Sequence, residues 1–340
     1  MSRLTVPWTT AVLLALAANL LAAGGKDTVR LEETYPPGSY VMTQQMKMHQ
    51  DIAAAGQPPQ KQDINQRLTV RMDVEPPDAS GVRVLTLRYE RVVQKVGQAG
   101  AIMTYDSAGP EEKNHPALAA SLAPLAQAEV TVHIDSDNTV QAVKGLDAIF
   151  DAVSKQNPQA ARSAKQWKKQ FGDQAVGRLV ERGSSMYPDK AVAVGESWNV
   201  ENAMALPFLG DARTVLDCRL DRITGSDATR TAVITYTGTM QIAKPKAGRL
   251  QGANTTFKKA SFEQKGTILY DLERRMGRET HLDQEGSMVM EITPPGKGGP
   301  GQAMTVTVDQ HLTMTQTVRP AGTKAGAASK EAGEAKGTSH

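Results

Sequence analysis

The sequence is poor in cysteine, in aromatic residues and in net charge. Cys218 is the only cysteine among 340 residues, so no disulfide can form within the chain. Aromatic residues make up 4% of the chain, which argues against a stacking surface for sugars or single-stranded nucleic acid. Lys and Arg number 39 against 36 Asp and Glu, and the two signs are interspersed. We therefore expect no nucleic-acid partner.

Catalytic and cofactor signatures are also missing. Gly195–Asn199 lacks the final glycine of a nucleophile elbow, and Asp135–Asn138 is not followed by the glycine and glutamate of a calcium loop. No histidine pair has the spacing of a helical zinc site. Convergence of His133, His281 and His311 from separate strands is the remaining metal hypothesis, and single solvent-facing histidines are the commoner case. We expect no enzymatic activity, no cofactor and no metal site.

Long apolar runs are absent after the N-terminus. A short basic start is followed by an apolar run from Val6 to Leu21, and Ala22–Gly25 supplies the small residues that a signal peptidase needs. A membrane anchor is the alternative, but the run is short for a span and contains an asparagine and an early proline. We predict that residues 1–25 are a signal peptide and that the protein is exported to the periplasm or the extracellular space.

Most of the remaining chain has the two-residue period of β-strands. This pattern predicts two β-rich arms, residues 26–143 and residues 188–320. Strands are expected at 40–50, 68–74, 82–96, 102–105, 129–135, 139–143, 215–223, 231–242, 262–272, 280–292 and 304–318. A phase shift within Val82–Val96 indicates a β-bulge. Lys244–Ala253 is expected to be a loop, and residues 321–340 a disordered tail.

Helical periodicity is confined to short segments. Residues 116–126 are rich in Ala and Leu and predict one helix. Two further helical faces are formed by Leu146, Ile149, Phe150 and Val153, and by Ala160, Ala164, Trp167 and Phe171. Residues 144–187 are therefore a helical section between the arms. We predict an α+β fold dominated by long antiparallel strands in a strongly curved sheet or half-barrel, and leave open whether the arms form one domain or two.

Three motifs give the chain a family resemblance. They are Tyr-Pro-Pro-Gly-x-Tyr at Tyr35–Tyr40, the Val-x-Val-Gly-Glu-Ser-Trp phrase within Pro188–Trp198, and Gly-x-x-x-Tyr-Asp at Gly266–Asp271. With these the sequence resembles a poorly characterised family of exported bacterial proteins of unknown function. The resemblance implies export and a β-rich body and assigns no activity. The plan of the chain also looks like the lipoprotein-carrier half-barrels of the envelope, which is an analogy of architecture.

Methionine is the remaining distinctive feature, with fourteen residues. Its flexible, polarisable side chain suits surfaces that grip variable apolar ligands, although filling an aromatic-poor core is the commoner role. The candidate ligand-binding residues are Met42, Met46, Met48, Met288, Met290, Trp167 and Trp198. We predict a non-catalytic protein that binds an apolar ligand such as lipid between sheet and helices. The alternative is an envelope or extracellular protein-interaction or structural module with no small ligand.

Overall fold

The computed structural model describes most of the chain between residues 28 and 323. The described residues are 28–32, 34–136, 139–156, 168, 172–173, 186–206, 210–226, 229–245, 247–250, 253–296, 299–300 and 302–323. The predicted signal peptide, Trp167 and nearly all of the predicted tail lie outside these residues.

Strands dominate the described chain, with one short α-helix inside the N-terminal arm and a second directly after it. The strands of the N-terminal arm are β1 (Thr28–Val29), β2 (Gly38–Ala54), β3 (Gln60–Val74), β4 (Arg83–Gln98), β5 (Ala101–Asp106), β6 (Glu129–Ile134) and β7 (Val140–Lys144). The helices are α1 (Pro116–Ala126) and α2 (Leu146–Gln156), preceded by a 3-10 turn at Glu111–Lys113. The C-terminal arm contains β8 (Val192–Ala193), β9 (Ser197–Leu206), β10 (Gly210–Thr224), β11 (Thr231–Pro245), β12 (Ala247–Leu250), β13 (Ala253–Asp271), β14 (Met276–Thr293), β15 (Pro295–Gly296), β16 (Gly299–Pro300) and β17 (Met304–Pro320).

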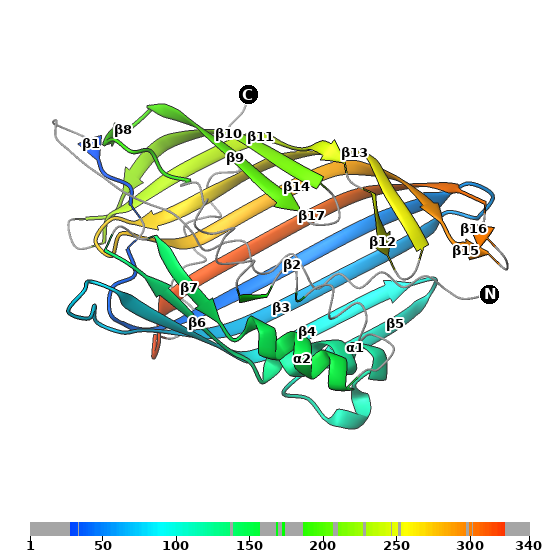
Figure 1. Cartoon of the computed structure of the whole chain (residues 1–340). Coiled ribbons are helices and arrows are strands. Elements are labelled where there is room, and N and C mark those ends of the chain that lie inside the picture. The colour runs from blue at the N-terminus through cyan, green and yellow to red at the C-terminus, as the bar shows by residue number, and fades with distance from the viewer. Residues whose placement is uncertain are drawn as a thin grey trace.

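Both arms contribute to one antiparallel sheet of 13 strands. Its order is β7-β6-β4-β3-β2-β17-β14-β13-β11-β10-β9, with β5 beside β4 and β12 beside β13. The first and last long strands, β2 and β17, pair from Tyr40 opposite Pro320 to Ala54 opposite Val306. Figure 1 shows this seam in the middle of the sheet, where blue β2 lies beside red β17. The arms are therefore joined by backbone hydrogen bonds, and the predicted curved sheet is confirmed.

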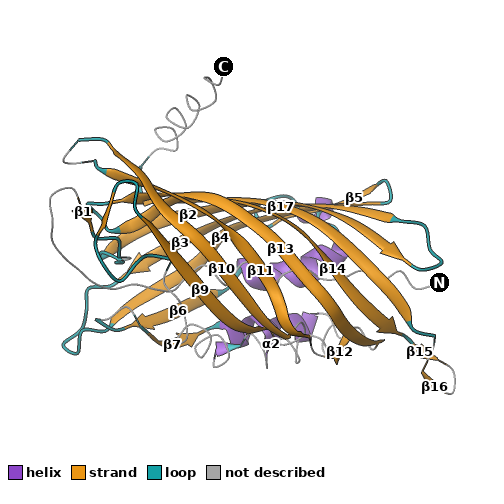
Figure 2. Ribbon diagram, turned by 90° about the horizontal axis from the view of Figure 1, so that it is seen from above, coloured by secondary structure: helices purple, strands orange, loops and turns teal. Residues whose placement is uncertain are grey.

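The sheet arches, and the two helices lie beneath the arch (Figure 2). Glycines in neighbouring strands of the C-terminal arm fit this curvature, because a strand without a side chain can bend toward its neighbour. A Cβ on Gly286 would lie 2.6 Å from Phe262 Cα, and a Cβ on Gly266 would collide with the Tyr236 ring. The aromatic rings thus cover the space that the glycines leave on the inner face.

Alternation along the strands gives the sheet an apolar inner face and a polar outer face. In β3, buried Ile64, Leu68 and Val70 alternate with solvent-facing residues. Leu122 of α1 and Leu146 of α2 pack on the inner face of this arm. The helical bounds of α1 and the start of α2 agree with the sequence pattern, so both predictions are confirmed.

The predicted bulge in β4 is confirmed. Thr69 pairs with Arg91 and Val70 pairs with Tyr89, so Glu90 is the extra residue. The prediction of a loop at Lys244–Ala253 is wrong, because β12 pairs with the start of β13 as a tight hairpin. Its proline and glycines concealed a strand too short to show a period. No helix within the described residues has the length and apolar character needed to cross a membrane.

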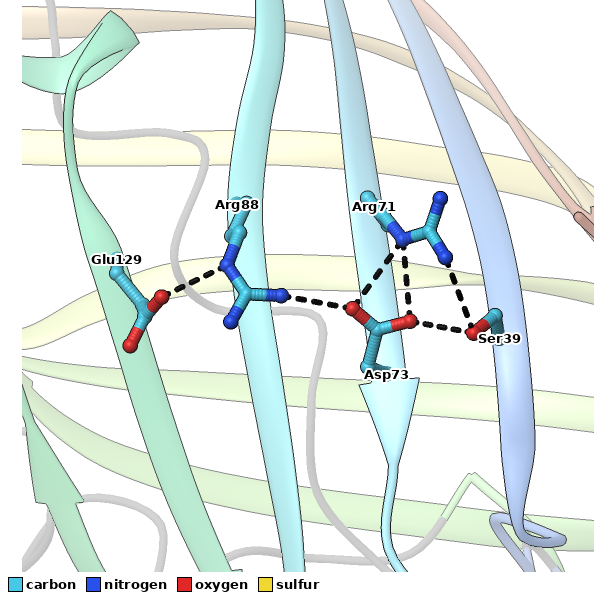
Figure 3. Close-up of polar contacts among 5 residues, drawn as sticks. All are labelled: Ser39, Arg71, Asp73, Arg88 and Glu129. Carbon is cyan, nitrogen blue, oxygen red and sulfur yellow. Dashed lines mark hydrogen bonds and ion pairs between the residues drawn. The ribbon is translucent and has the colours of Figure 1, made fainter.

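The outer face of the N-terminal arm carries a charge network that links four strands (Figure 3). Asp73 of β3 accepts hydrogen bonds from Ser39 of β2 (2.5 Å) and from Arg88 of β4 (2.8 Å). Arg71 also donates to Asp73, and Arg88 donates to Glu129 of β6 at 2.7 Å. The hydrogen bond from Ser39 leads, with Arg71 and Arg88, to a lowered pKa for Asp73, although partial burial opposes the shift.

The end of the C-terminal arm is closed by an N-terminal segment and by the chain before β9. Tyr270 is fully buried, and its hydroxyl exchanges hydrogen bonds with the backbone N–H (3.0 Å) and carbonyl of Glu32. The Tyr187 ring meets the Tyr270 ring edge-on at 5.2 Å. Trp198 Nε1 donates to the Met186 carbonyl at 3.0 Å. Trp198 and Tyr270 belong to the sequence motifs at Pro188–Trp198 and Gly266–Asp271, and these contacts explain why those motifs contain aromatic residues.

Candidate functional site on the inner face

Four apolar clusters divide the inner face. One lies under the helices, and one is closed by Val29, Leu31 and Val192 at the far end. All the buried members of the third come from strands of the large sheet, β10, β11, β13, β14 and β17. The fourth lies at the seam and combines Met46 and Met48 with residues of β3, β4 and β17.

The candidate methionines fall into different clusters. Met46 and Met48 lie together in the seam cluster, where Met314 packs against them. Met288 and Met290 belong to the third cluster, and partly buried Met42 packs against the cluster under the helices. Trp198 lies in the cluster at the far end, distinct from all five methionines. The structure therefore unites two of the candidate residues and distributes the others along the same face.

A band of buried glutamines runs through the seam. Six of the ten buried polar residues are glutamines of the inner face, here called the glutamine band: Gln44, Gln50, Gln62, Gln66, Gln94 and Gln284. Buried amides are costly unless they are hydrogen-bonded. Gln66 Nε2 donates to Gln94 Oε1 at 3.1 Å, and Gln50 Nε2 donates to Gln310 Oε1 at 3.1 Å. Of this band, Gln50 and its cross-strand partner Gln62 lie between the row of Met48 and the row of Met288, whereas Gln66 and Gln94 lie in the row of Met46.

Thioether sulfur takes part in the same band. Gln44 Nε2 donates to Met314 Sδ at 2.8 Å, and Met314 is the direct cross-strand partner of Met46. The next residues across the sheet are Leu282, Gly266 and Tyr236. The seam therefore places amides, thioethers and apolar side chains side by side on one surface.

A shallow, open pocket of about 440 Å³ lies around Gly266. Its lining comes from β11, β13, β14 and β17 and combines four inward residues, Tyr236, Gly266, Leu282 and Met314, with eight outward residues: Thr235, Thr237, Lys265, Thr267, His281, Asp283, Thr313 and Thr315. The volume is within the range of about 300–1,000 Å³ that is usual for ligand pockets. Because most of the lining residues point outward, the pocket lies mainly on the outer face of the sheet, whereas the Tyr236 ring fills the inner side at Gly266.

The central part of the inner face is electrically neutral. Between Gln44 and Gln50 of β2, and along the strand segments paired with them, the inward positions hold only apolar residues, glutamine, threonine and glycine. The nearest cation toward the start of β14 is Arg278, beyond Thr280 and at the register shift between Gly277 and Glu279. Such a surface is suited to contact an uncharged or apolar molecule.

Charged groups at the seam lie on the opposite, outer face. His49 of β2 is the direct cross-strand partner of His311 of β17. His49 Nδ1 lies 2.8 Å from Asp63, and the hydrogen bond to Asp63 raises the pKa of His49. His311 Nε2 lies 3.0 Å from Asp283. No group of three or more potential ligands in the described part of the chain could hold a metal ion.

Cys218 is 1% exposed, and its thiol is buried. Burial, followed by the nearby charge of Asp217, raises the pKa of the Cys218 thiol to about 12. A thiol in this state is a poor nucleophile. It contributes packing to the inner face and no reactive group.

The comparisons with known proteins identify a family. A family of unknown function, DUF6263, matches residues 80–274, more than half of the chain. The chain belongs to the DUF6263 family. No curated protein matches the sequence of this DUF6263 protein.

Solved structures similar to this DUF6263 protein include lipovitellin, described for its lipid-protein interactions. That match has a TM-score of 0.39 and 8% identity, and it covers 86% of this chain and 27% of lipovitellin. The chain thus spans about a quarter of that protein's length. The β domain of the Bordetella autotransporter BrkA matches with a TM-score of 0.23 and 8% identity, over 82% of this chain and 99% of that domain.

Sequence reasoning missed the glutamine band of this DUF6263 protein. Gln44 and Gln50 alternate in phase with Met46 and Met48, and Gln62 and Gln66 alternate in phase with Ile64. Polar residues in the apolar phase of a strand are a detectable signal. Because glutamine is usually exposed, these positions do not stand out in the sequence as buried.

Proposed function

We propose that this protein is exported and binds an apolar ligand, such as lipid, without catalysis. The ligand would lie on the inner face between the sheet and the helices. The observation that carries this proposal is the neutral inner surface at the seam, where Met314 packs against Met46 and Met48. Thioether side chains adapt to ligands of variable shape, which supports a lipid over a rigid polar metabolite.

Native mass spectrometry tests the proposal. The mature chain would be purified from an exporting host and extracted with organic solvent. We expect a co-purifying lipid at a fixed stoichiometry, and uptake of a fluorescent fatty-acid probe by the extracted protein. A lipid-free mass together with no probe uptake would rule out lipid binding.

A pair of variants separates binding from stability. Met314→Ala removes a side chain that lines the pocket, whereas Met276→Ala removes a buried methionine of the cluster under the helices. Both changes should lower the free energy of unfolding by about 2–5 kcal/mol, depending on how far the residue is buried. Only Met314→Ala should weaken probe binding at a temperature where both variants are folded.

Protein interaction is the second candidate function, and one observation favours it. β9 is the last strand in the order of the sheet, and its ten residues pair with β10 on one side only among the described strands. An extended segment of a partner could add to such an edge. If the protein is lipid-free, protein interaction becomes the leading candidate function. Asn199→Pro in β9 should then abolish capture of the envelope partner that the wild-type protein captures.

A further inference from the structure

The Gln50 side chain is the least exposed polar group of the inner face. Its exposed fraction is 0%, and it lies between Met48 and Ile52 on the same face of β2. Its Nε2 donates to Gln310, but its Oε1 has no hydrogen-bond partner among the described residues. An unpaired buried acceptor of this kind costs about 1–3 kcal/mol. A ligand with a hydrogen-bond donor would remove that cost.

Gln66 is a second buried glutamine of the inner face and serves as the comparison for Gln50. It lies on the adjacent strand β3, is also buried, and pairs with Gln94. Gln50 lies four positions after Met46 on β2, about 13 Å at the usual rise of ~3.3 Å per residue. An alkyl chain whose polar end met Gln50 would therefore run over Met48 toward Met46 and its cross-strand partner Met314.

The charge of the surface restricts the polar end of such a ligand. No ionisable side chain occupies the inward positions of β2 between Gln44 and Gln50 or their direct partners on β3 and β17. Burying a carboxylate or phosphate there without a cation would cost several kcal/mol. A hydroxyl carries no charge and can both donate and accept, so it suits an amide.

We propose that Gln50 binds the hydroxyl group of an uncharged long-chain lipid whose apolar part lies along Met48 and Met46. This inference rests on the proposed function and specifies the ligand class for the same site. Anionic lipids, by contrast, would require a cation such as Arg278, which lies beyond the neutral band on β14.

The test compares dodecanol, dodecanoate and methyl dodecanoate on the delipidated full mature chain by isothermal titration calorimetry. We expect dodecanol to bind about 5–10-fold more tightly than the ester, the equivalent of one net hydrogen bond. Gln50→Met should remove that preference and leave ester binding unchanged. Gln66→Met is the matched control and should retain the preference. Circular dichroism establishes that both variants are folded.

Three results would overturn the inference. Equal binding of dodecanol and the ester to wild type would remove the role of the hydroxyl while the proposed lipid function stands. Tightest binding of dodecanoate, lost in Arg278→Met, would replace the hydroxyl lipid by an anionic one. Binding of none of the three probes would defeat the proposed function as well.

Discussion

Gln50 of β2 donates a hydrogen bond to Gln310 of β17, 260 positions later in the chain. The two amides lie where the first and last long strands pair, at the centre of the sheet. Beside them, Met46 faces Met314 across the same seam. The most polar part of the inner face is therefore also the place where the two arms are joined.

Removing the Tyr270 hydroxyl should weaken the closure of the C-terminal arm. Tyr270→Phe leaves the backbone N–H and carbonyl of Glu32 without their partner in a buried place. We expect a loss of about 1–3 kcal/mol in the free energy of unfolding, measured by urea denaturation. Tyr40→Phe, which removes a partly buried bond to the Pro36 carbonyl, should cost less. Equal losses in the two variants would contradict the special role of Tyr270.

A side chain at Gly286 should be poorly tolerated. The Cβ of Gly286→Ala would lie 2.6 Å from Phe262 Cα and against the Ser261 carbonyl, so backbone must shift. We expect a loss of about 1–3 kcal/mol, the usual cost of overpacking. Gly97→Ala in β4 is the control, because its Cβ would meet its nearest atom, in Asp63, at 3.7 Å. The argument fails if both variants unfold at the wild-type urea concentration.

His49 should make the stability of the seam depend on pH. Because Asp63 raises the pKa of folded His49, the contribution of His49 is fully present below the unfolded pKa of about 6.5. It is lost as the pH rises through the folded pKa. His49→Gln should therefore destabilise the protein more at about pH 5.5 than at about pH 8. Urea denaturation at both pH values measures the difference.

NMR titration of the His49 ring gives the independent check. Asp63→Asn should lower the pKa of His49, because it removes the carboxylate that lies 2.8 Å from Nδ1. Asp309→Asn, on the neighbouring strand, is the matched control and should change it less. An unaltered His49 titration in Asp63→Asn would refute the assignment.

Asp73 should make the stability of the protein depend on pH in the acid range, opposite to the range in which His49 acts. Its pKa is lowered in the folded protein, so its contribution is present above the unfolded value of about 3.9 and is lost as pH falls through the folded pKa. Asp73→Asn should cost no more than about 1 kcal/mol at neutral pH, because the network is partly exposed. The difference from wild type should shrink in acid. Urea denaturation in acid and at neutral pH measures the difference.

The sequence by itself determined most of the long strands, their faces and the two short helices, but not β9 or β12. Alternation in β3 fixes which side of a strand is apolar, and the i, i+3, i+4, i+7 spacing of Leu146 to Val153 fixes a helical face, because both follow from local backbone geometry. The sequence also contained the three motifs that gave the chain its family resemblance. These features require no knowledge of distant residues.

Only the tertiary structure decided which strands meet. Periodicity gives a strand its faces but names no neighbour, so the pairing of β2 with β17 could not be predicted from Tyr40 or Pro320 alone. The burial of Gln50 was hidden for the same reason, since an amide in an apolar phase is buried only when the curved sheet encloses it. The seam, and the candidate site on it, are consequences of that long-range pairing.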